Sequence, residues 1–389
     1  MTDTPATDLP LLPRRRFNVG SILGTLGPLV ALIVIIIVTA ILERYLTGGS
    51  RFLTIENQLN ILRQYSFVGI VALGMTFVII SGGIDLSVGS IVAFAGGLGI
   101  WTMNTALTAS TIMKAHGRAI EREMDSPYSP FRLWLAQTFS DRGLAESEST
   151  AVWIAVVTVL LAGMLAGLIN GLLIAKGKLA PFIATLGGFA AYRSLALAMA
   201  DGGEYRSSSS KLFPILGTKG IEVPWIELGP NRVMTLPWSV IIFFGLAIVL
   251  SIVLNRTRYG RYVYAVGNNE RAARYSAIAV DRIKIITYTL IGATCGLSAM
   301  LLSSRMNSVA SSTTGQQYEL DAIAAVVIGG TRMTGGAGSI WGTVIGVLIL
   351  GEIGNMLNFL QVSPYLQGLV KGVIIIAAVL VQRVGRKTA

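Results

Sequence analysis

The ionisable and nucleophilic side chains of this 389-residue chain are few and widely separated. His116 is the only histidine and Cys295 the only cysteine, so no cluster can hold a metal ion or place a thiolate beside a base. The nearest match to a phosphate-binding loop is Gly177-Lys178, but Leu179 follows where such a loop needs Ser or Thr. The sequence therefore predicts no catalytic residue, no metal site and no cofactor held by the chain itself.

Polar side chains within or beside apolar runs indicate a different kind of site. Charges are costly inside a bilayer, so each one there is a candidate for function. Thr185 precedes two glycines, and its hydroxyl could meet a polar solute. Arg193 lies about 20 Å along the same predicted helix from Ala180, which also fits a side chain that extends to the outer membrane surface. The candidate residues for a substrate path are Asp85, Ser87, Thr185, Arg193, Glu319 and Asp321.

Two glycine-rich turns resemble each other, one at 82–90 and one at 329–339. Each follows an apolar segment and opens the next. Transporters are often built from internal repeats, with broken helices near the substrate path. Asp85 and Arg332 occupy matching positions in the two turns, and we expect them to interact.

The composition indicates a helical membrane protein. The chain is 53% hydrophobic and 13% charged, with a mean hydropathy of +0.66, whereas soluble domains are about a quarter charged. The uncharged run 17–42 is too long for a signal peptide, so we expect an uncleaved first span. The expected fold is all-α and polytopic, with some helices broken at glycine-rich turns. The ten expected spans are 19–42, 64–81, 87–105, 151–174, 180–200, 237–254, 284–303, 320–331, 338–358 and 365–382.

The net charge of +11 is explained by topology rather than by nucleic-acid binding. Basic residues concentrate in alternate connections, and Lys and Arg are retained on the cytoplasmic side. This places both termini in the cytoplasm. The expected parts are a tail at 1–18, a permease domain at 19–382 and a tail at 383–389. Within the domain, 110–150 and 201–236 are external, and 255–284 is cytoplasmic.

The external segments are unusually long. Residues 110–150 are broken near Ser126–Pro130, after which Phe131, Trp134, Leu135 and Phe139 fall on one helical face. Such a helix could lie at the membrane surface or against a partner, or the segment could pack as a lid. Residues 201–236 are rich in Gly, Ser and Pro and predict an irregular surface.

The cytoplasmic connection 255–284 carries seven basic and two acidic residues. Its middle predicts a short helix with Asn268 capping the first turn and Glu270 near the positive end of the helix dipole. Ala272, Ala273 and Ser276 give a small-residue face that a partner could approach closely. The residues proposed to receive force from that partner are Gly267, Asn268, Glu270, Arg271, Ala272, Ala273, Ser276 and Ile278.

Five motifs, in this order, resemble the ribose/xylose-type permease subunits of bacterial ATP-binding-cassette sugar importers. They are GMTFVIISGGIDLSVGS (74–90), PFIATLGG (181–188), RYGRYVYAVGNNERAARYSAI (258–278), YELDAIAAVVIGGTRMTGGAGSIWGT (318–343) and VKGVIIIAAVLV (370–381). The resemblance implies an inner-membrane subunit that translocates a pentose, hexose or polyol. It also implies ATPase subunits that bind ATP and Mg inside, a periplasmic sugar-binding protein outside and a second permease copy. The segment matching 267–278 would dock into the ATPase.

Three features depart from that family. Ala277 replaces the usual glycine, Arg332 replaces a small polar residue, and the insert 110–150 exceeds the usual short connection. We expect the insert to contact the binding protein or cap the outer mouth.

Other functions remain open from the sequence. A permease for branched-chain amino acids would share the architecture. An ion-coupled carrier would need membrane carboxylates arranged as a relay, and only Glu352 lies well inside a span. A receptor or scaffold would not need the alanine-rich cytoplasmic helix.

Overall fold

The computed structural model describes residues 19–49, 51–122, 124–145, 147–207, 210–229, 232–363, 366–370, 372–373 and 376. Eight helices of this described part are long and apolar enough to cross a membrane. They are α1 (Val19–Thr47), α2 (Ile55–Ile80), α3 (Val88–Leu107), α6 (Glu148–Ala175), α7 (Pro181–Met199), α9 (Trp238–Arg256), α12 (Val280–Met306) and α14 (Ile340–Phe359). They match the first seven and the ninth expected spans, which confirms an all-α polytopic membrane protein. The expected tails and most of the span 365–382 lie outside the described residues.

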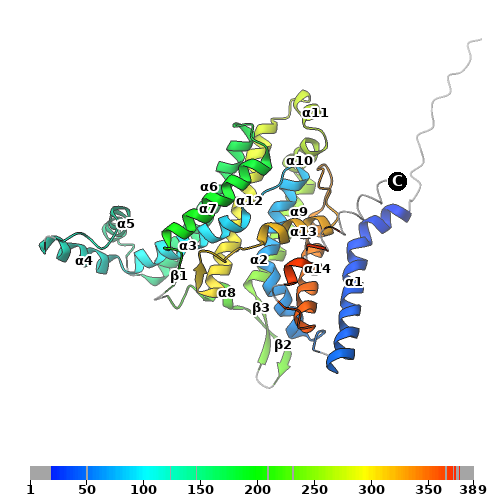
Figure 1. Cartoon of the computed structure of the whole chain (residues 1–389), viewed down its shortest axis with the longest axis horizontal. Coiled ribbons are helices and arrows are strands. Elements are labelled where there is room, and N and C mark those ends of the chain that lie inside the picture. The colour runs from blue at the N-terminus through cyan, green and yellow to red at the C-terminus, as the bar shows by residue number, and fades with distance from the viewer. Residues whose placement is uncertain are drawn as a thin grey trace, which may run out of the picture.

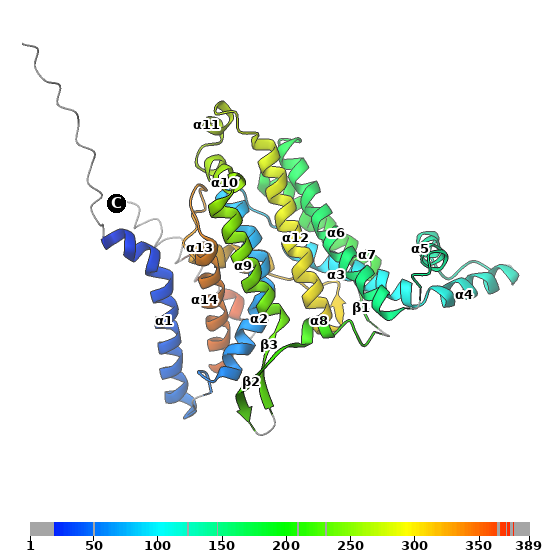
Figure 2. The same cartoon turned by 180° about the vertical axis from the view of Figure 1, so that it is seen from behind.

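The bundle is organised around α2 and α12. Helix α2 is buried along most of its length, and it contacts α9, α12 and α14. The main apolar core therefore lies along α2, with Leu73, Met75 and Phe77 fully buried there. Helix α1 lies at the edge of the bundle, where Leu32 packs against Ile349 and Ile353 of α14 (Figures 1 and 2).

Helices α6 and α12 form the closest helix pair. Gly163 and Gly167 of α6 face Gly292 and Gly296 of α12 so closely that an added methyl group would collide with the backbone of the other helix. Small residues spaced in this way let membrane helices pack backbone against backbone. The small-residue repeat of α6 therefore serves packing within the chain.

The expected eighth span is a short helix, α13 (Tyr318–Ile328), which ends at Gly329 and Gly330. Gly330 has φ +91°, a left-handed conformation that side chains disfavour and glycine tolerates. The chain then turns through 331–339 before α14 begins at the Ser339 N-cap. A helix of this length is too short to cross a bilayer alone, so α13 is the broken helix that its glycine-rich end predicts.

The connection 255–284 contains two helices, α10 (Arg258–Asn268) and α11 (Glu270–Tyr275), and α11 forms the tip at one end of the bundle (Figure 1). Segment 201–236 is more regular than we expected. It contains β1 (Glu204–Arg206), the short helix α8 (Ile215–Thr218), β2 (Gly220–Gly229) and β3 (Arg232–Pro237).

Strands β2 and β3 form an antiparallel hairpin at the opposite end of the bundle from α11 (Figure 2). Strand β1 pairs with β4 (Ser308–Ala310), beyond α12. The expectation of an irregular surface was wrong because strand pairing satisfies the backbone of these segments, and a Gly- and Ser-rich composition does not reveal such pairing.

The insert folds into two helices, α4 (Ala109–Glu121) and α5 (Pro130–Asp141), which pack against each other and extend sideways from the bundle (Figures 1 and 2). The Ser129 side chain accepts a hydrogen bond from the Arg132 amide and caps α5 at the break near Ser126–Pro130. The four residues expected on one face of this helix, Phe131, Trp134, Leu135 and Phe139, differ in their exposure. Phe139 is buried, whereas Phe131 and Trp134 are exposed.

Candidate functional site

A buried polar cluster lies where the chain passes from α2 to α3. The Ser87 amide and hydroxyl both donate to Asp85 Oδ1, at 2.8 and 2.6 Å. Asn170 of α6 donates through Nδ2 to Ser87 Oγ at 2.8 Å. All three side chains are fully buried. The cluster thus joins the glycine-rich turn 82–90 to the middle of α6.

Three further polar residues enclose the cluster. The Tyr192 hydroxyl of α7 lies 3.3 Å from Asn170 Oδ1, and the Tyr288 hydroxyl of α12 donates to the Ile84 carbonyl at 3.2 Å. Thr185 is also buried, but its hydroxyl donates to the Pro181 carbonyl of its own helix at 2.9 Å. Thr185 therefore lines the cluster in this structure without presenting its hydroxyl to open space.

Asp85 does not pair with Arg332, and this prediction was wrong. Asp85 is fully buried, whereas Arg332 is exposed, and no hydrogen bond or ion pair joins them in the described part of the chain. Matching positions in a repeat do not give two side chains the same environment: Asp85 is enclosed within the bundle, whereas Arg332 is exposed although Thr331 beside it is buried. Asp85 Oδ2 is buried and has no hydrogen-bond partner among the described residues.

The other three path candidates form a second group. Arg193 donates through Nη1 to the carbonyls of Ser311 and Thr314, at 2.9 and 3.0 Å, and so joins α7 to the loop before α13. Glu319 of α13 interacts electrostatically with Arg193, and Asp321 with Tyr65 of α2. Thr185 and Arg193 are separated by about 12 Å along α7. The six candidates therefore occupy two depths connected by α7.

The two glycine-rich turns meet at Gly267, near the end of α10. A methyl group added to Gly267 would collide with the Ile80 carbonyl and lie 2.7 Å from the Gly336 amide. The Gly336 amide itself donates to the Ile80 carbonyl at 2.9 Å. A methyl group on Gly335 would lie 2.7 Å from the Gly267 carbonyl and 3.1 Å from Gly82 Cα. The α10–α11 segment is therefore in backbone contact with both turns.

Helix α11 differs in two ways from the prediction. Its N-cap is Asn269, whose side chain accepts from the Ala272 amide at 3.0 Å, and Asn268 is the last residue of α10. Of the expected small-residue face, Ala272 and Ser276 are exposed, but Ala273 is buried within the core of its own chain. A six-residue helix is too short for periodicity to show which side faces the rest of the chain.

The exposed surface at the tip includes Tyr275, which is 91% exposed and which the sequence pattern did not single out. Arg271 and Arg274 are also exposed, and Ile278 is half-buried against the core. A large aromatic ring in water beside basic residues and small side chains is typical of a protein-binding surface.

A network of ion pairs fixes α11 to its neighbours. Glu270 accepts from Arg274 at 3.1 Å and from Lys284 at 2.8 Å, and Asp281 accepts from Arg274 at 2.8 Å and Lys178 at 2.9 Å. Partial burial disfavours the charge on Glu270, but the hydrogen bonds from Lys284 and Arg274 outweigh this and lower the pKa of the carboxyl. The network joins α11 to α12 and to the loop between α6 and α7.

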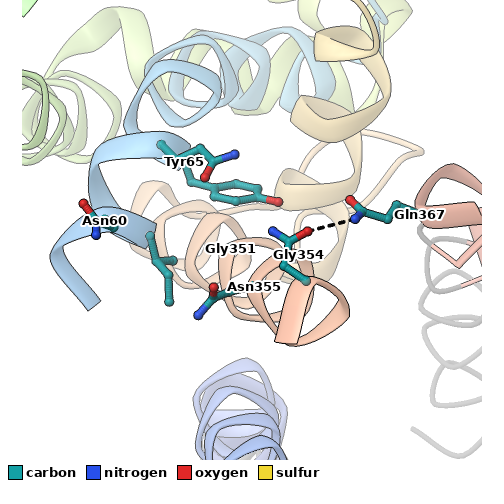
Figure 3. A pocket seen from close by; sticks show the side chains of 9 residues that line it. Asn60, Tyr65, Gly351, Gly354, Asn355 and Gln367 are labelled. Carbon is teal, nitrogen blue, oxygen red and sulfur yellow. Dashed lines mark hydrogen bonds between the residues drawn. The ribbon is translucent and has the colours of Figure 1, made fainter. Parts of the chain in front are cut away.

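The described part of the chain contains two small pockets lined by polar residues. One, of about 110 Å³, is lined by the turn Ser81–Gly83, Pro181, Tyr288 and the Glu270–Lys284 pair, and thus lies between the polar cluster and α11. The other, of about 70 Å³, lies between α2 and α14 (Figure 3). It is lined by Tyr65 and by five carboxamide side chains: Asn60, Gln64, Asn355, Asn358 and Gln367.

Both pockets are far smaller than the roughly 300–1,000 Å³ of ordinary ligand sites. Each has room for a few water molecules. In this conformation, neither pocket can enclose a monosaccharide.

Asn170, Tyr192 and Tyr288 were not selected from the sequence. Asn170 is a carboxamide within a long apolar span, and such polar residues usually face a bundle interior. That signal could have identified it. Tyr192 lies seven residues after Thr185 and therefore on the same face of α7, a spacing that could also have identified it. Tyr288 lies far away in sequence, and only the packing of α12 brings it to the cluster.

Comparison with known proteins gives a consistent result. Residues 57–379 match a family described as "Branched-chain amino acid transport system / permease component". The ribose import permease protein of Bacillus subtilis (strain 168) is 38% identical, over 95% of this chain and 96% of that protein. No solved structure matches the chain.

Two further relatives are named for other pentoses. The L-arabinose transport system permease protein of Escherichia coli (strain K12) is 32% identical, over 96% of this chain and 95% of that protein. The xylose transport system permease protein of Haemophilus influenzae is 29% identical, over 88% of this chain and 92% of that protein.

Proposed function

Because this chain belongs to the permease-component family of branched-chain amino acid transport systems, and its relatives are named for pentoses, we propose that it translocates a monosaccharide. It acts as the membrane subunit of an ATP-binding-cassette importer in the bacterial inner membrane. The amino-acid alternative is not favoured, because relatives that cover nearly the whole chain are named for ribose, arabinose and xylose.

The α10–α11 surface is the proposed docking site for the ATPase subunits, which carry ATP and Mg. Both ends of the chain and this surface would then lie in the cytoplasm, in agreement with the basic residues of 255–284. The observation that carries the proposal is the contact of Gly267 with both glycine-rich turns. Movement of α11 by an ATPase would press directly on the backbone beside the Asp85 cluster.

The substrate path is proposed to run along α7, from Arg193 and Glu319 outside to the cluster of Asp85, Ser87 and Thr185 inside. The hydroxyl, carboxamide and carboxyl side chains along this path suit a hydroxyl-rich solute, which can both donate and accept hydrogen bonds. Asp85 Oδ2 is a buried acceptor that could bind a sugar hydroxyl when the bundle opens.

The full transporter is proposed to contain two permease copies, two ATPase subunits and a periplasmic sugar-binding protein. The binding protein would deliver the sugar to the end of the bundle that carries the β2–β3 hairpin, because this end lies opposite α11 (Figure 1). The permease itself is not an enzyme.

Transport in proteoliposomes tests the proposal. Uptake of radiolabelled ribose, arabinose or xylose should require the chain, its ATPase partner, its binding protein and internal ATP together. Omission of any one component should abolish uptake. Accumulation driven by a proton or sodium gradient with this chain alone would contradict it.

A further inference from the structure

We infer that the α4–α5 hairpin is a membrane-surface element whose exposed aromatic residues enter the lipid of the external leaflet. The inference concerns the hairpin of residues 109–141, which the proposed transport mechanism does not use. We infer that lipid, and not a partner protein, covers the exposed aromatic rings, because these rings lie level with a membrane-spanning helix.

The depth of α5 is set by a stack of aromatic rings that begins inside a span. The Trp101 ring of α3 stacks on Phe131 with centroids 5.9 Å apart, and Phe131 stacks on Trp134 at 5.8 Å. Trp101 lies six residues before the end of α3 at Leu107, or about 9 Å along the helix axis. Phe131 is therefore level with a residue inside the expected span 87–105, and not with the end of α3.

The stacked residues are not buried by protein. Phe131 and Trp134 are each 60% exposed. Two other residues of α5, Ala136 and Phe139, are buried in the apolar cluster that joins the hairpin to α3 and α6. The buried residues attach the hairpin to the bundle. The exposed Phe131 and Trp134 rings are not needed for that attachment and leave apolar surface uncovered by protein.

The span α6, which shares the buried apolar cluster with the hairpin, also exposes apolar side chains. Trp153, near the same end of α6, is 68% exposed, and Val157 and Leu161 extend the exposed apolar surface along that span. Tryptophan and tyrosine concentrate where spans meet the membrane surface. The Arg132 guanidinium, next to Phe131, lies 5.2 Å from the centre of the Tyr128 ring. This cation–π contact places a charged group and a tyrosine together, as expected where a helix meets the membrane surface.

The exposed side of α5 becomes polar beyond Trp134. Gln137 donates to Asp141 at 2.6 Å, and both side chains are exposed on the side that carries Trp134. The helix therefore leaves the apolar layer within about two turns. The lipid contact is confined to the start of α5, as expected for an element that lies in the membrane surface rather than crossing it.

Spin labels at single cysteines test this placement in the intact chain. The variants W134C and F131C are made on a C295A background, and W153C on α6 serves as the lipid reference. D141C on the same exposed side of α5 serves as the water reference. Each is placed in nanodiscs of phosphatidylethanolamine and phosphatidylglycerol, and collisions with oxygen and with a soluble nickel chelate are measured.

Labels at 134 and 131 should match the label at 153, with frequent oxygen collisions and few nickel collisions, and differ from the label at 141. Labels at 134 and 131 that collide with nickel as often as the label at 141 would overturn the inference. So would a label at 134 that is shielded only after the binding protein is added, because the surface would then be a protein contact.

Discussion

Ala277 occupies a backbone position that usually belongs to glycine. Helix α11 ends in a Schellman motif, in which the Ile278 amide donates to the Ala273 carbonyl and the Ala277 amide to the Arg274 carbonyl, both at 3.1 Å. This motif places Ala277 at φ +59°. A side chain there costs roughly 1–2 kcal/mol, so the replacement noticed in the sequence introduces strain at the end of the docking helix.

Ala277→Gly should therefore stabilise the protein. The relief of strain is offset in part by the greater freedom of glycine in the unfolded chain, about 0.4–1 kcal/mol, which leaves a gain of up to about 1.6 kcal/mol. Thermal unfolding in detergent measures it as a higher midpoint.

The matched control is Ala272→Gly, at an exposed helical position five residues earlier. It should lower stability by about 1 kcal/mol. Equal losses from both variants would show that Ala277 is not strained in solution.

At the scale of elements, α10 and α11 connect the docking surface to the two glycine-rich turns. Gly267 allows this connection, because any side chain there would collide with the backbone of Ile80. The Tyr264 hydroxyl of α10 donates to the Gly338 carbonyl at 2.8 Å, which adds a second attachment to the turn before α14.

Gly267→Ala should break the mechanical connection between the ATPase docking surface and the two glycine-rich turns. The methyl group forces α10 away from both turns, so ATPase subunits would still bind Tyr275 and its neighbours but could no longer move the Asp85 turn. Overpacking at this contact should cost about 1–3 kcal/mol. Uptake and binding-protein-stimulated ATP hydrolysis should therefore fall about tenfold or more at equal membrane levels.

Gly245→Ala is the control for a glycine in a helix. An added methyl group at Gly245 of α9 meets no atom within 4 Å, so transport should stay near wild type. Normal uptake by Gly267→Ala would remove the α10 contact from the mechanism.

The elements differ in how far the sequence could predict them. The eight long spans are visible because an apolar run of bilayer length with at most a few charges is typical of a membrane span and of little else. The cap of α11 was misplaced by one residue because Asn268 and Asn269 have the same capping side chain. Ala273 was assigned to a partner because a short helix does not reveal its inward side. The β2–β3 hairpin was missed because strand pairing depends on partners that composition does not specify.

At the scale of the whole molecule, the end that carries α11 and the end that carries the β2–β3 hairpin should face opposite compartments. Tyr275 at the first end is 91% exposed, and Trp225 at the second is 82% exposed. Both positions therefore accept a cysteine without loss of packing.

In intact spheroplasts, a membrane-impermeant maleimide should label Trp225→Cys at once and Tyr275→Cys only after permeabilisation. The unmodified chain, whose single native Cys295 is buried, gives the background level of labelling. The reverse order of labelling would invert the proposed orientation and exclude α11 as the cytoplasmic docking site.

The candidate site shows what a linear sequence cannot supply. Asp85, Ser87 and Thr185 were selected from their local context, and the structure brings them to one cluster. The pairing of Asp85 with Arg332 failed because the two turns touch through their backbones while the Asp85 side chain is buried and the Arg332 side chain is exposed. Asn170 and Tyr288 join the cluster through contacts between distant helices, and a single sequence contains no record of those contacts.

The glycine contact between α6 and α12 limits which parts of the protein can change position. Two helices whose backbones touch at Gly163, Gly167, Gly292 and Gly296 have no side chains that can slide over one another. Shear motion needs such an adaptable layer, so we expect this pair to move as a rigid body. Alternation between outward- and inward-open states must therefore take place at its boundaries. The boundary with α7 is the nearest candidate, because Tyr192 reaches α6 there through hydrogen bonds that can break and re-form.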